Sequence, residues 1–206
     1  MQGFIIDTNL FFNMEAGLGL GQTTKEIASK LNKIVKNQAS EDISIITTPT
    51  VVEEIKSFFE TEQDEVLLQI LSCIKIKSPS TQEMKISALL FDSLISEYRE
   101  RSYRGMKVAE EELIETGKLF MGKEVLLQKE FQQAIGKKIA TLRDRFRNAT
   151  RKGTIDSQAD LDIILLAKEL NLPLVTTDEG VVRWARMVGV SEISPSVFGK
   201  KMQEYF

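Results

Sequence analysis

Short apolar segments alternate with amphipathic helical segments at both ends of the chain. GFII, ISIIT and LPLV have the length and composition of buried strands, whereas TTKEIASKLNKIV and DLDIILLAKEL have helical periodicity. This alternation favours a parallel sheet with helices on both faces. We therefore expect an α/β fold, with ligands bound beyond the carboxyl ends of the strands.

The middle of the chain breaks this alternation, because residues 81–152 have an almost entirely helical pattern. We predict helices at 84–104, near 110–120 and from about 123 to 150, with Gly105 and Gly122 marking breaks. The expected organisation is one α/β domain formed by residues 1–80 and 153–206, interrupted by an inserted helical arm at 81–152.

Helix starts are predicted from pairs of residues that can cap each other. Thr23 and Glu26 fit a capping box at the first long helix. After the second predicted strand, Pro49 ends the strand, and Thr50 with Glu53 fits the same pattern.

The 206 residues include no histidine and a single cysteine, Cys73, which lies in an apolar stretch and is expected to be buried. Nucleophilic schemes that need histidine are excluded, as are zinc sites with imidazole or several thiolate ligands. An enzyme of this composition must use carboxylates, lysines, hydroxyls and hard cations such as Mg²⁺ or Mn²⁺.

The beginning of the chain has no basic leader or cleavage site, and no apolar run approaches the roughly 18 residues of a membrane-spanning helix. The expected location is the cytoplasm.

Carboxylates stand where the predicted strands end. Asp7 follows GFII, Asp178 follows LVTT, and Glu54 begins the helix after the second strand. Asp156 and Asp160 are four residues apart at the start of a helix, which puts both on one face. Asp162 lies about 200° around that helix from Asp160, so it is expected to point elsewhere, and its role stays open.

Most of these residues also have a purely structural interpretation. Asp156 fits a helix N-cap, Asp160 fits a first-turn acid that complements the helix dipole, and Asp178 fits a turn. Asp7 is the hardest to explain in this way, because burying a carboxylate beside apolar residues is costly without a partner.

Converging carboxylates would repel one another, by roughly 4 kcal/mol for one pair at about 4 Å and an effective dielectric constant of about 20. Hard cations relieve this repulsion and can activate a water molecule for hydrolysis of a phosphodiester.

Four motifs together resemble a PIN domain: IIDTN, TPTVVEEI, DSQAD and LVTTDEG. The resemblance covers about residues 1–80 and 153–194, and it implies a metal-dependent ribonuclease with a PIN-like sheet. The family's acidic positions correspond to Asp7, Glu54, Asp160 and Asp178, with Asp156 as a further acid. It implies catalysis by Asp7, Asp156, Asp160 and Asp178, and metal binding by the same four residues and Glu54.

The chain's size, its helical insertion, and the segments FIIDTNLFFN and DLDIILLAKELNLPLVTTDEGVVRWA resemble a narrower family. These are the homologs of Aquifex ribonuclease P, a minimal protein-only ribonuclease P once labelled RNA ligase partner protein in archaea. The resemblance implies removal of the 5′ leader from precursor tRNA with Mg²⁺ (or Mn²⁺), without an RNA subunit. It also implies that the arm supports homo-oligomerisation and tRNA docking.

The segment KKIATLRDRFRNATRK concentrates positive charge in a chain whose net charge is −3. We expect Arg143, Arg145, Arg147, Arg151 and Lys152 to contact an RNA backbone, although a solvated helix face is the alternative. Tyr98 and Tyr103 are the aromatic candidates for base contacts. Apolar residues at helical spacing in the arm, such as Leu89, Leu90 and Leu94, favour self-association.

Three other functions fit the same residues. A PIN toxin would arrest growth on expression, and such chains are usually shorter. A non-catalytic partner in an RNA-repair complex would normally have lost acidic positions, which here are all present. A flap-type DNA nuclease shares the carboxylate chemistry, and sequence does not exclude it.

Overall fold

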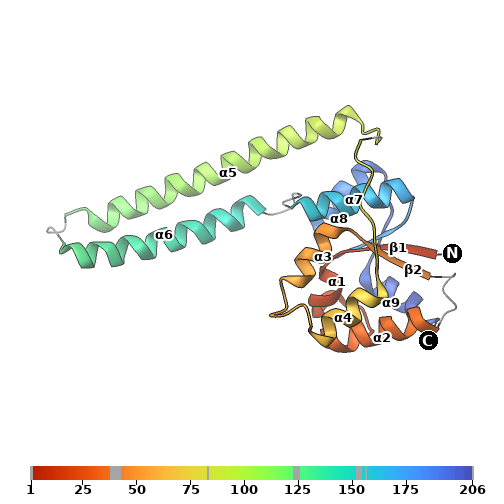
Figure 1. Ribbon diagram of the computed structural model, residues 1–206. Coiled ribbons are helices and arrows are strands. Elements are labelled where there is room, and N and C mark those ends of the chain that lie inside the picture. The colour runs from red at the N-terminus through yellow and green to blue at the C-terminus, as the bar shows by residue number, and fades with distance from the viewer. Residues whose placement is uncertain are drawn as a thin grey trace. The chain divides into compact units, whose positions relative to one another are not determined.

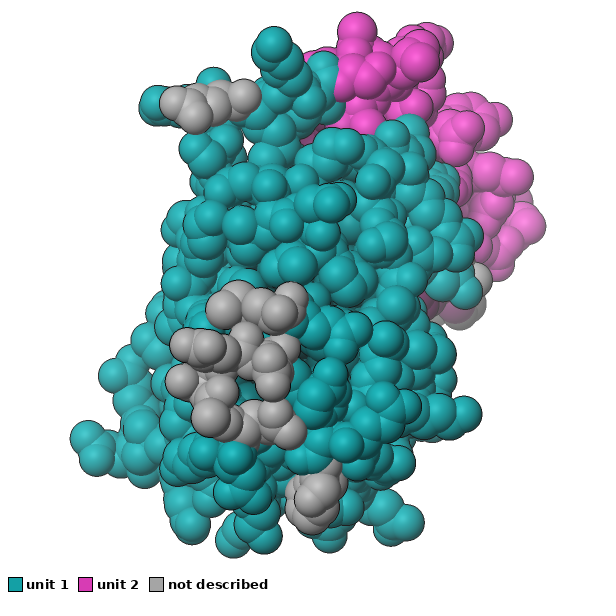
Figure 2. Space-filling view, turned by 90° about the vertical axis from the view of Figure 1, so that its right-hand side faces the viewer, with its two compact units in different colours: residues 1–86, 155–206 teal, residues 87–154 magenta. Residues whose placement is uncertain are grey.

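The computed structural model describes residues 2–37, 43–82, 84–122, 126–151, 155 and 157–205. The chain divides into two compact units, which are coloured separately in Figure 2. The first, here the sheet unit, consists of Met1–Ile86 and Ile155–Phe206, and the second, here the helical unit, is Ser87–Thr154.

The described part of the sheet unit contains a five-stranded sheet in the order β3-β2-β1-β4-β5, and every neighbouring pair is parallel. The strands are β1 (Gln2–Ile6), β2 (Ile43–Thr47), β3 (Lys75–Ile76), β4 (Leu174–Val175) and β5 (Glu192–Ile193). The central strand β1 is buried from Gly3 to Ile6, as expected for a strand covered on both faces. The predicted α/β fold with a parallel sheet is confirmed.

Helices surround this sheet (Figure 1). They are α1 (Asn9–Phe12), the 3₁₀ helix η1 (Met14–Ala16), α2 (Thr24–Asn37), α3 (Pro49–Lys56), α4 (Glu65–Cys73), α7 (Gln158–Leu170), α8 (Glu179–Val188) and α9 (Pro195–Gln203). Their apolar faces complete the core, in which Phe4 of β1 meets Phe198 of α9 edge-on, with ring centroids 5.1 Å apart. Cys73 is buried, as predicted.

The helix caps follow the sequence prediction at α2 but not at α3. At α2 the Thr23 side chain accepts a hydrogen bond from the Glu26 amide, as expected, while the Glu26 carboxylate accepts one from Gln22. The prediction of Thr50 and Glu53 as the caps of α3 is wrong. Thr48 is the N-cap and accepts a hydrogen bond from the Val51 amide, because Pro49 occupies the first helical turn instead of merely ending the strand.

The helical unit contains two long helices, α5 (Ala88–Phe120) and α6 (Gln128–Arg151), which run side by side (Figure 1). The predicted break at Gly105 is wrong, because α5 continues through it for 33 residues. A Cβ atom on Gly105 would lie 2.5 Å from Cε2 of Phe146, so the glycine allows close packing of α6. Gly122, with φ of +71°, does follow the end of α5, as predicted.

Within the described ranges, none of the helices combines the length and apolar composition that crossing a bilayer requires.

Candidate active site

The carboxyl ends of three adjacent strands bring polar residues together. Asp7 follows β1, which lies between β2 and β4 in the sheet. The chain leaves β2 into α3, which carries Glu54, and leaves β4 through Thr176 into α8, capped by Asp178. Because parallel strands end at the same edge, the topology gathers these side chains.

Asp7 is a buried carboxylate, with 4% of its surface exposed. Its Oδ2 atom accepts hydrogen bonds from Thr176 Oγ1 at 2.6 Å and from Asn9 Nδ2 at 3.1 Å. Burial raises the pKa of Asp7, hydrogen bonds from the Thr176 side chain and the Thr8 backbone oppose this shift, and the nearby charges of Glu54 and Asp178 add to it. The charges of Glu54 and Asp178 thus act in the same direction as burial, against the charged form of Asp7.

Glu54 is held to the residue next to Asp7. Its Oε2 atom accepts a hydrogen bond from Thr8 Oγ1 at 2.7 Å, which joins the start of α1 to α3. The neighbouring Glu53 instead forms an exposed ion pair with Lys56 at 2.9 Å. The two consecutive glutamates of α3 therefore have different partners: Glu54 contacts Thr8, whereas Glu53 contacts Lys56.

Asp178 is the N-cap of α8 and is linked to Asp7 through Thr176. Its Oδ1 atom accepts hydrogen bonds from the amides of Gly180 at 2.7 Å and Val181 at 3.0 Å. The Asp178 amide donates to Thr176 Oγ1 at 3.0 Å, the same hydroxyl that donates to Asp7. One threonine thus connects two of the predicted catalytic aspartates.

The start of α7 carries Asp160, another of the predicted acids. Ser157 is the N-cap, and its hydroxyl accepts a hydrogen bond from the Asp160 amide, while the Asp160 carboxylate accepts one from the Ser157 amide. The structural interpretation of Asp160 as a first-turn acid is therefore correct, and its catalytic role stays a prediction. Asp156 lies outside the described residues.

Sequence reasoning missed the hydroxyl and amide groups that position the carboxylates. Thr8, Asn9 and Thr176 all stand beside the predicted strand ends, and that polar composition was the available signal. A further hydrogen bond, from Thr50 Oγ1 to Asp162 Oδ2 at 2.8 Å, ties α3 to α7. Asp162 is therefore engaged at the start of α3.

In the part of the chain that the structure describes, which omits Asp156, no three acidic or cysteine side chains are gathered closely enough to hold a metal ion. The donors that do meet are all oxygen atoms, the type that Mg²⁺ and Mn²⁺ prefer. The pKa of Asp7 is raised mainly by burial, and the negative charges of Glu54 and Asp178 add to this shift. The donor chemistry fits a hard divalent cation.

The basic residues predicted to contact RNA differ in their environments. Arg145 donates to Glu112 at 2.6 Å and to Glu111, so it holds α6 to α5. Arg147 is exposed and only loosely paired with Asp144, at 3.7 Å. Arg143 and Arg151 are exposed, whereas Lys152 lies outside the described residues.

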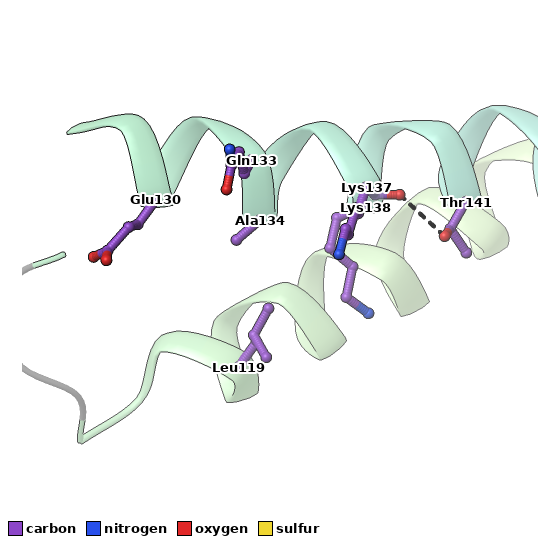
Figure 3. A pocket seen from close by; sticks show the side chains of 7 residues that line it. All are labelled: Leu119, Glu130, Gln133, Ala134, Lys137, Lys138 and Thr141. Carbon is purple, nitrogen blue, oxygen red and sulfur yellow. Dashed lines mark hydrogen bonds between the residues drawn. The ribbon is translucent and has the colours of Figure 1, made fainter. Parts of the chain in front are cut away.

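A pocket of about 410 Å³ lies between the end of α5 and the first half of α6 (Figure 3). Lys137 and Lys138 line it together with Glu130 and Gln133, so its charge is mixed. It has none of the acidic character of the sheet edge.

Comparison with known proteins gives consistent matches over the whole chain. The family model of PINc domain ribonucleases matches residues 3–206. An RNA-free ribonuclease P of Methanopyrus kandleri is 35% identical, covering 99% of this chain and 94% of the relative. Proteins of the same name from Ignicoccus hospitalis and Methanocaldococcus jannaschii are 34% and 32% identical, covering 98% and 99% of this chain and 95% and 92% of the relatives.

Proposed function

Because the chain belongs to the PINc domain ribonucleases and to the family of the RNA-free ribonucleases P, we propose that it removes the 5′ leader from precursor tRNA by endonucleolytic hydrolysis, without an RNA subunit. The similarity to proteins of that name, which includes the helical unit as well as the sheet unit, carries this proposal. The expected cytoplasmic location is part of it, since the substrate is precursor tRNA.

The proposed active site consists of Asp7, Asp156, Asp160 and Asp178, with Glu54 as a further metal ligand. These residues would hold Mg²⁺, or Mn²⁺ in its place, which would supply an activated water and stabilise the leaving oxygen. Thr176 and Asn9 orient the Asp7 carboxylate, and Thr8 orients that of Glu54. This network supports a pre-organised acidic site at the edge of the sheet.

The test is incubation of the purified protein with a precursor tRNA that carries a 5′ leader, with Mg²⁺ and with EDTA, followed by mapping of the cut. We expect one Mg²⁺-dependent cut that leaves a 5′-phosphorylated mature tRNA. Cutting at other positions would retain a PIN nuclease but contradict ribonuclease P activity. A folded protein that cuts no RNA would contradict the enzymatic proposal.

We propose that exposed basic residues of α6 bind the tRNA backbone, with Arg143, Arg147 and Arg151 as the main contacts, and that Lys152, which lies outside the described residues, contributes to binding. A surface of this kind acts mostly through charge and therefore depends on salt concentration. Replacing Arg143 and Arg147 by glutamine should weaken tRNA binding and reduce the slope of log affinity against log salt by about two. An unchanged slope would assign these residues to a solvated face.

We also propose that the protein is a homo-oligomer. Helix α5 exposes large apolar side chains at spacings of three, four or seven to eight residues, which places them along one face: Phe91, Ile95, Tyr98, Met106 and Leu113. A row of exposed apolar side chains of this kind is typical of an interaction surface. Sedimentation analysis should give a mass above 23.3 kDa, and Ile95→Glu with Leu113→Glu should lower it.

A further inference from the structure

Two phenylalanines that closely follow Thr8 and Glu54 along the chain stack on each other. The rings of Phe12, at the end of α1, and Phe58, just after α3, have centroids 4.1 Å apart and planes 15° apart. Phe59 approaches Phe12 edge-on at 6.0 Å and supports the pair from another direction. Phe58 nevertheless remains 57% exposed. The stack therefore forms a supported aromatic surface that is open to solvent.

This pair follows the contact that positions Glu54 along both segments of the chain. Thr8 Oγ1 donates to Glu54, and Phe12 and Phe58 each follow their partner in that contact by four residues. Phe12 is the last residue of α1 and Phe58 lies in the turn after α3, so each segment is coiled over these four residues and advances by only about 6 Å. Since Thr8 directly follows Asp7, the aromatic pair is continuous with the acidic residues proposed to cut the RNA.

An exposed aromatic face beside a nuclease site is suited to an unpaired base. Single-stranded bases stack on phenylalanine faces with little dependence on sequence. On the tRNA side of the cut, the first base is paired in the acceptor stem, whereas the leader bases are free. The chemistry at this position therefore favours the leader.

The charges around Phe58 favour a base over a phosphate. Lys56 lies between Glu53 and Glu62, at 2.9 and 3.4 Å, so its positive charge is already engaged within the turn. Glu60 adds another negative charge nearby. A phosphate would be repelled here, but the uncharged face of a base would not.

We propose that Phe58, supported by Phe12, stacks against the base of a leader nucleotide close to the scissile phosphate and so positions the leader for cleavage. This inference rests on the proposed ribonuclease P function. Phe58 is thereby a positioning residue for the single-stranded part of the substrate.

The test measures kcat/KM for precursor tRNAs in which one of the first three leader nucleotides is replaced by an abasic ribose. At one position, loss of the base should lower kcat/KM of the wild-type protein by about 5- to 100-fold, the effect of one base–aromatic stack. Phe58→Ala should show a similar loss with the ordinary precursor and no further loss with that abasic precursor. Phe58→Tyr should stay near the wild-type value, whereas Phe58→Leu should resemble alanine.

Phe131→Ala is the matched control, because Phe131 of the helical unit is 46% exposed and also pairs with a second phenylalanine, Phe120, with ring centroids 5.5 Å apart. It should respond to the abasic precursor as the wild type does. Binding of leaderless mature tRNA should be the same for the wild type and Phe58→Ala. An unchanged melting temperature of Phe58→Ala would show that its loss of activity does not come from loss of the fold. A second variant, Phe12→Leu, removes the supporting ring and keeps an apolar side chain, so it tests the stack without deleting Phe58.

Several results would overturn the inference. Equal kcat/KM for Phe58→Ala and the wild type, or an abasic penalty that persists undiminished in Phe58→Ala, would remove Phe58 from leader binding. A lower oligomeric mass for Phe58→Ala would assign the surface to a second copy of the chain. If the wild-type protein cuts no precursor at all, the proposed function fails instead, which is a different outcome.

Discussion

Replacing Asp7 by asparagine tests whether the acidic site is built for a cation at the expense of stability. Asp7 is buried, and burial raises its pKa despite the hydrogen bonds it accepts. An asparagine oxygen could still accept the bonds from Thr176 and Asn9, while the buried charge would be removed. Without divalent cations, Asp7→Asn should therefore be more stable than the wild type.

The expected gain is about 1 to 2 kcal/mol, the scale found when imperfectly compensated buried polar groups are removed. For a chain of this size that corresponds to an increase in melting temperature of about 2 to 8 °C in EDTA. The same variant should have no cleavage activity, because it loses one of the proposed metal ligands. Asp92→Asn, at an exposed position of α5, is the control and should change neither property.

Mg²⁺ should reverse this order. A ligand at about 100 times its Kd stabilises a protein by about 2.7 kcal/mol, which exceeds the gain from removing the charge. The wild type should thus melt higher than Asp7→Asn in Mg²⁺ and lower in EDTA. Calorimetry of both proteins under both conditions measures the crossing.

The effect should also depend on pH in a defined direction. Below the ordinary carboxyl pKa near 3.8, Asp7 is protonated in both the folded and the unfolded states, so its charge has no cost. As the pH rises through that value and then through the higher pKa of the folded state, the wild type loses stability relative to Asp7→Asn. Above the folded-state pKa the difference should stay constant.

Two results would refute this reasoning. A lower melting temperature for Asp7→Asn in EDTA would mean that the hydrogen bonds outweigh the cost of burying the charge. Equal Mg²⁺-induced shifts in both proteins would remove Asp7 from the proposed metal ligands.

Three further changes test the site and the fold. Asp178→Ala should abolish cleavage and also cost about 1 kcal/mol by removing the α8 cap, whereas Asp178→Asn should keep the cap and lose only activity, as melting and cleavage assays would show. Arg145→Ala should lower the melting temperature by leaving the buried Glu112 without its closest cation, and adding Glu112→Gln should restore part of it. Gly199→Ala should destabilise the fold by about 3 kcal/mol or more in denaturant titration, because the new methyl group would collide with the backbone carbonyl of Leu18.

The sequence predicts features that depend on neighbours along the chain or on the geometry of parallel strands. Alternating apolar segments identify the sheet, and the strand ends are enough to identify Asp7, Glu54 and Asp178 as neighbours. The influence of the Glu54 and Asp178 charges on the pKa of Asp7 agrees with that reasoning. The capping contact between Thr23 and Glu26 is equally predictable, because both partners lie within one turn.

Features that depend on distant partners were not predictable in this way. Local propensity suggests a break at Gly105, but its lack of a side chain instead admits Phe146 from the other helix. The charge of Arg145 suggests an RNA contact. In the structure, however, its guanidinium group forms ion pairs with Glu111 and Glu112 of α5. The stack of Phe12 on Phe58 joins residues that periodicity alone cannot pair.

The threonines of the site explain how a protein without histidine can hold several carboxylates near one another. Thr8 donates to Glu54, Thr176 to Asp7 and Thr50 to Asp162, so each carboxylate receives a neutral donor from a neighbouring element. A lysine or arginine in these places would neutralise the charge and compete with a cation for the same oxygens. Neutral hydroxyls instead fix the oxygen positions and leave the negative charge in place. The repulsion that remains is the free energy that binding of a divalent cation would relieve, so the proposed metal would couple its own binding to folding of this edge of the sheet.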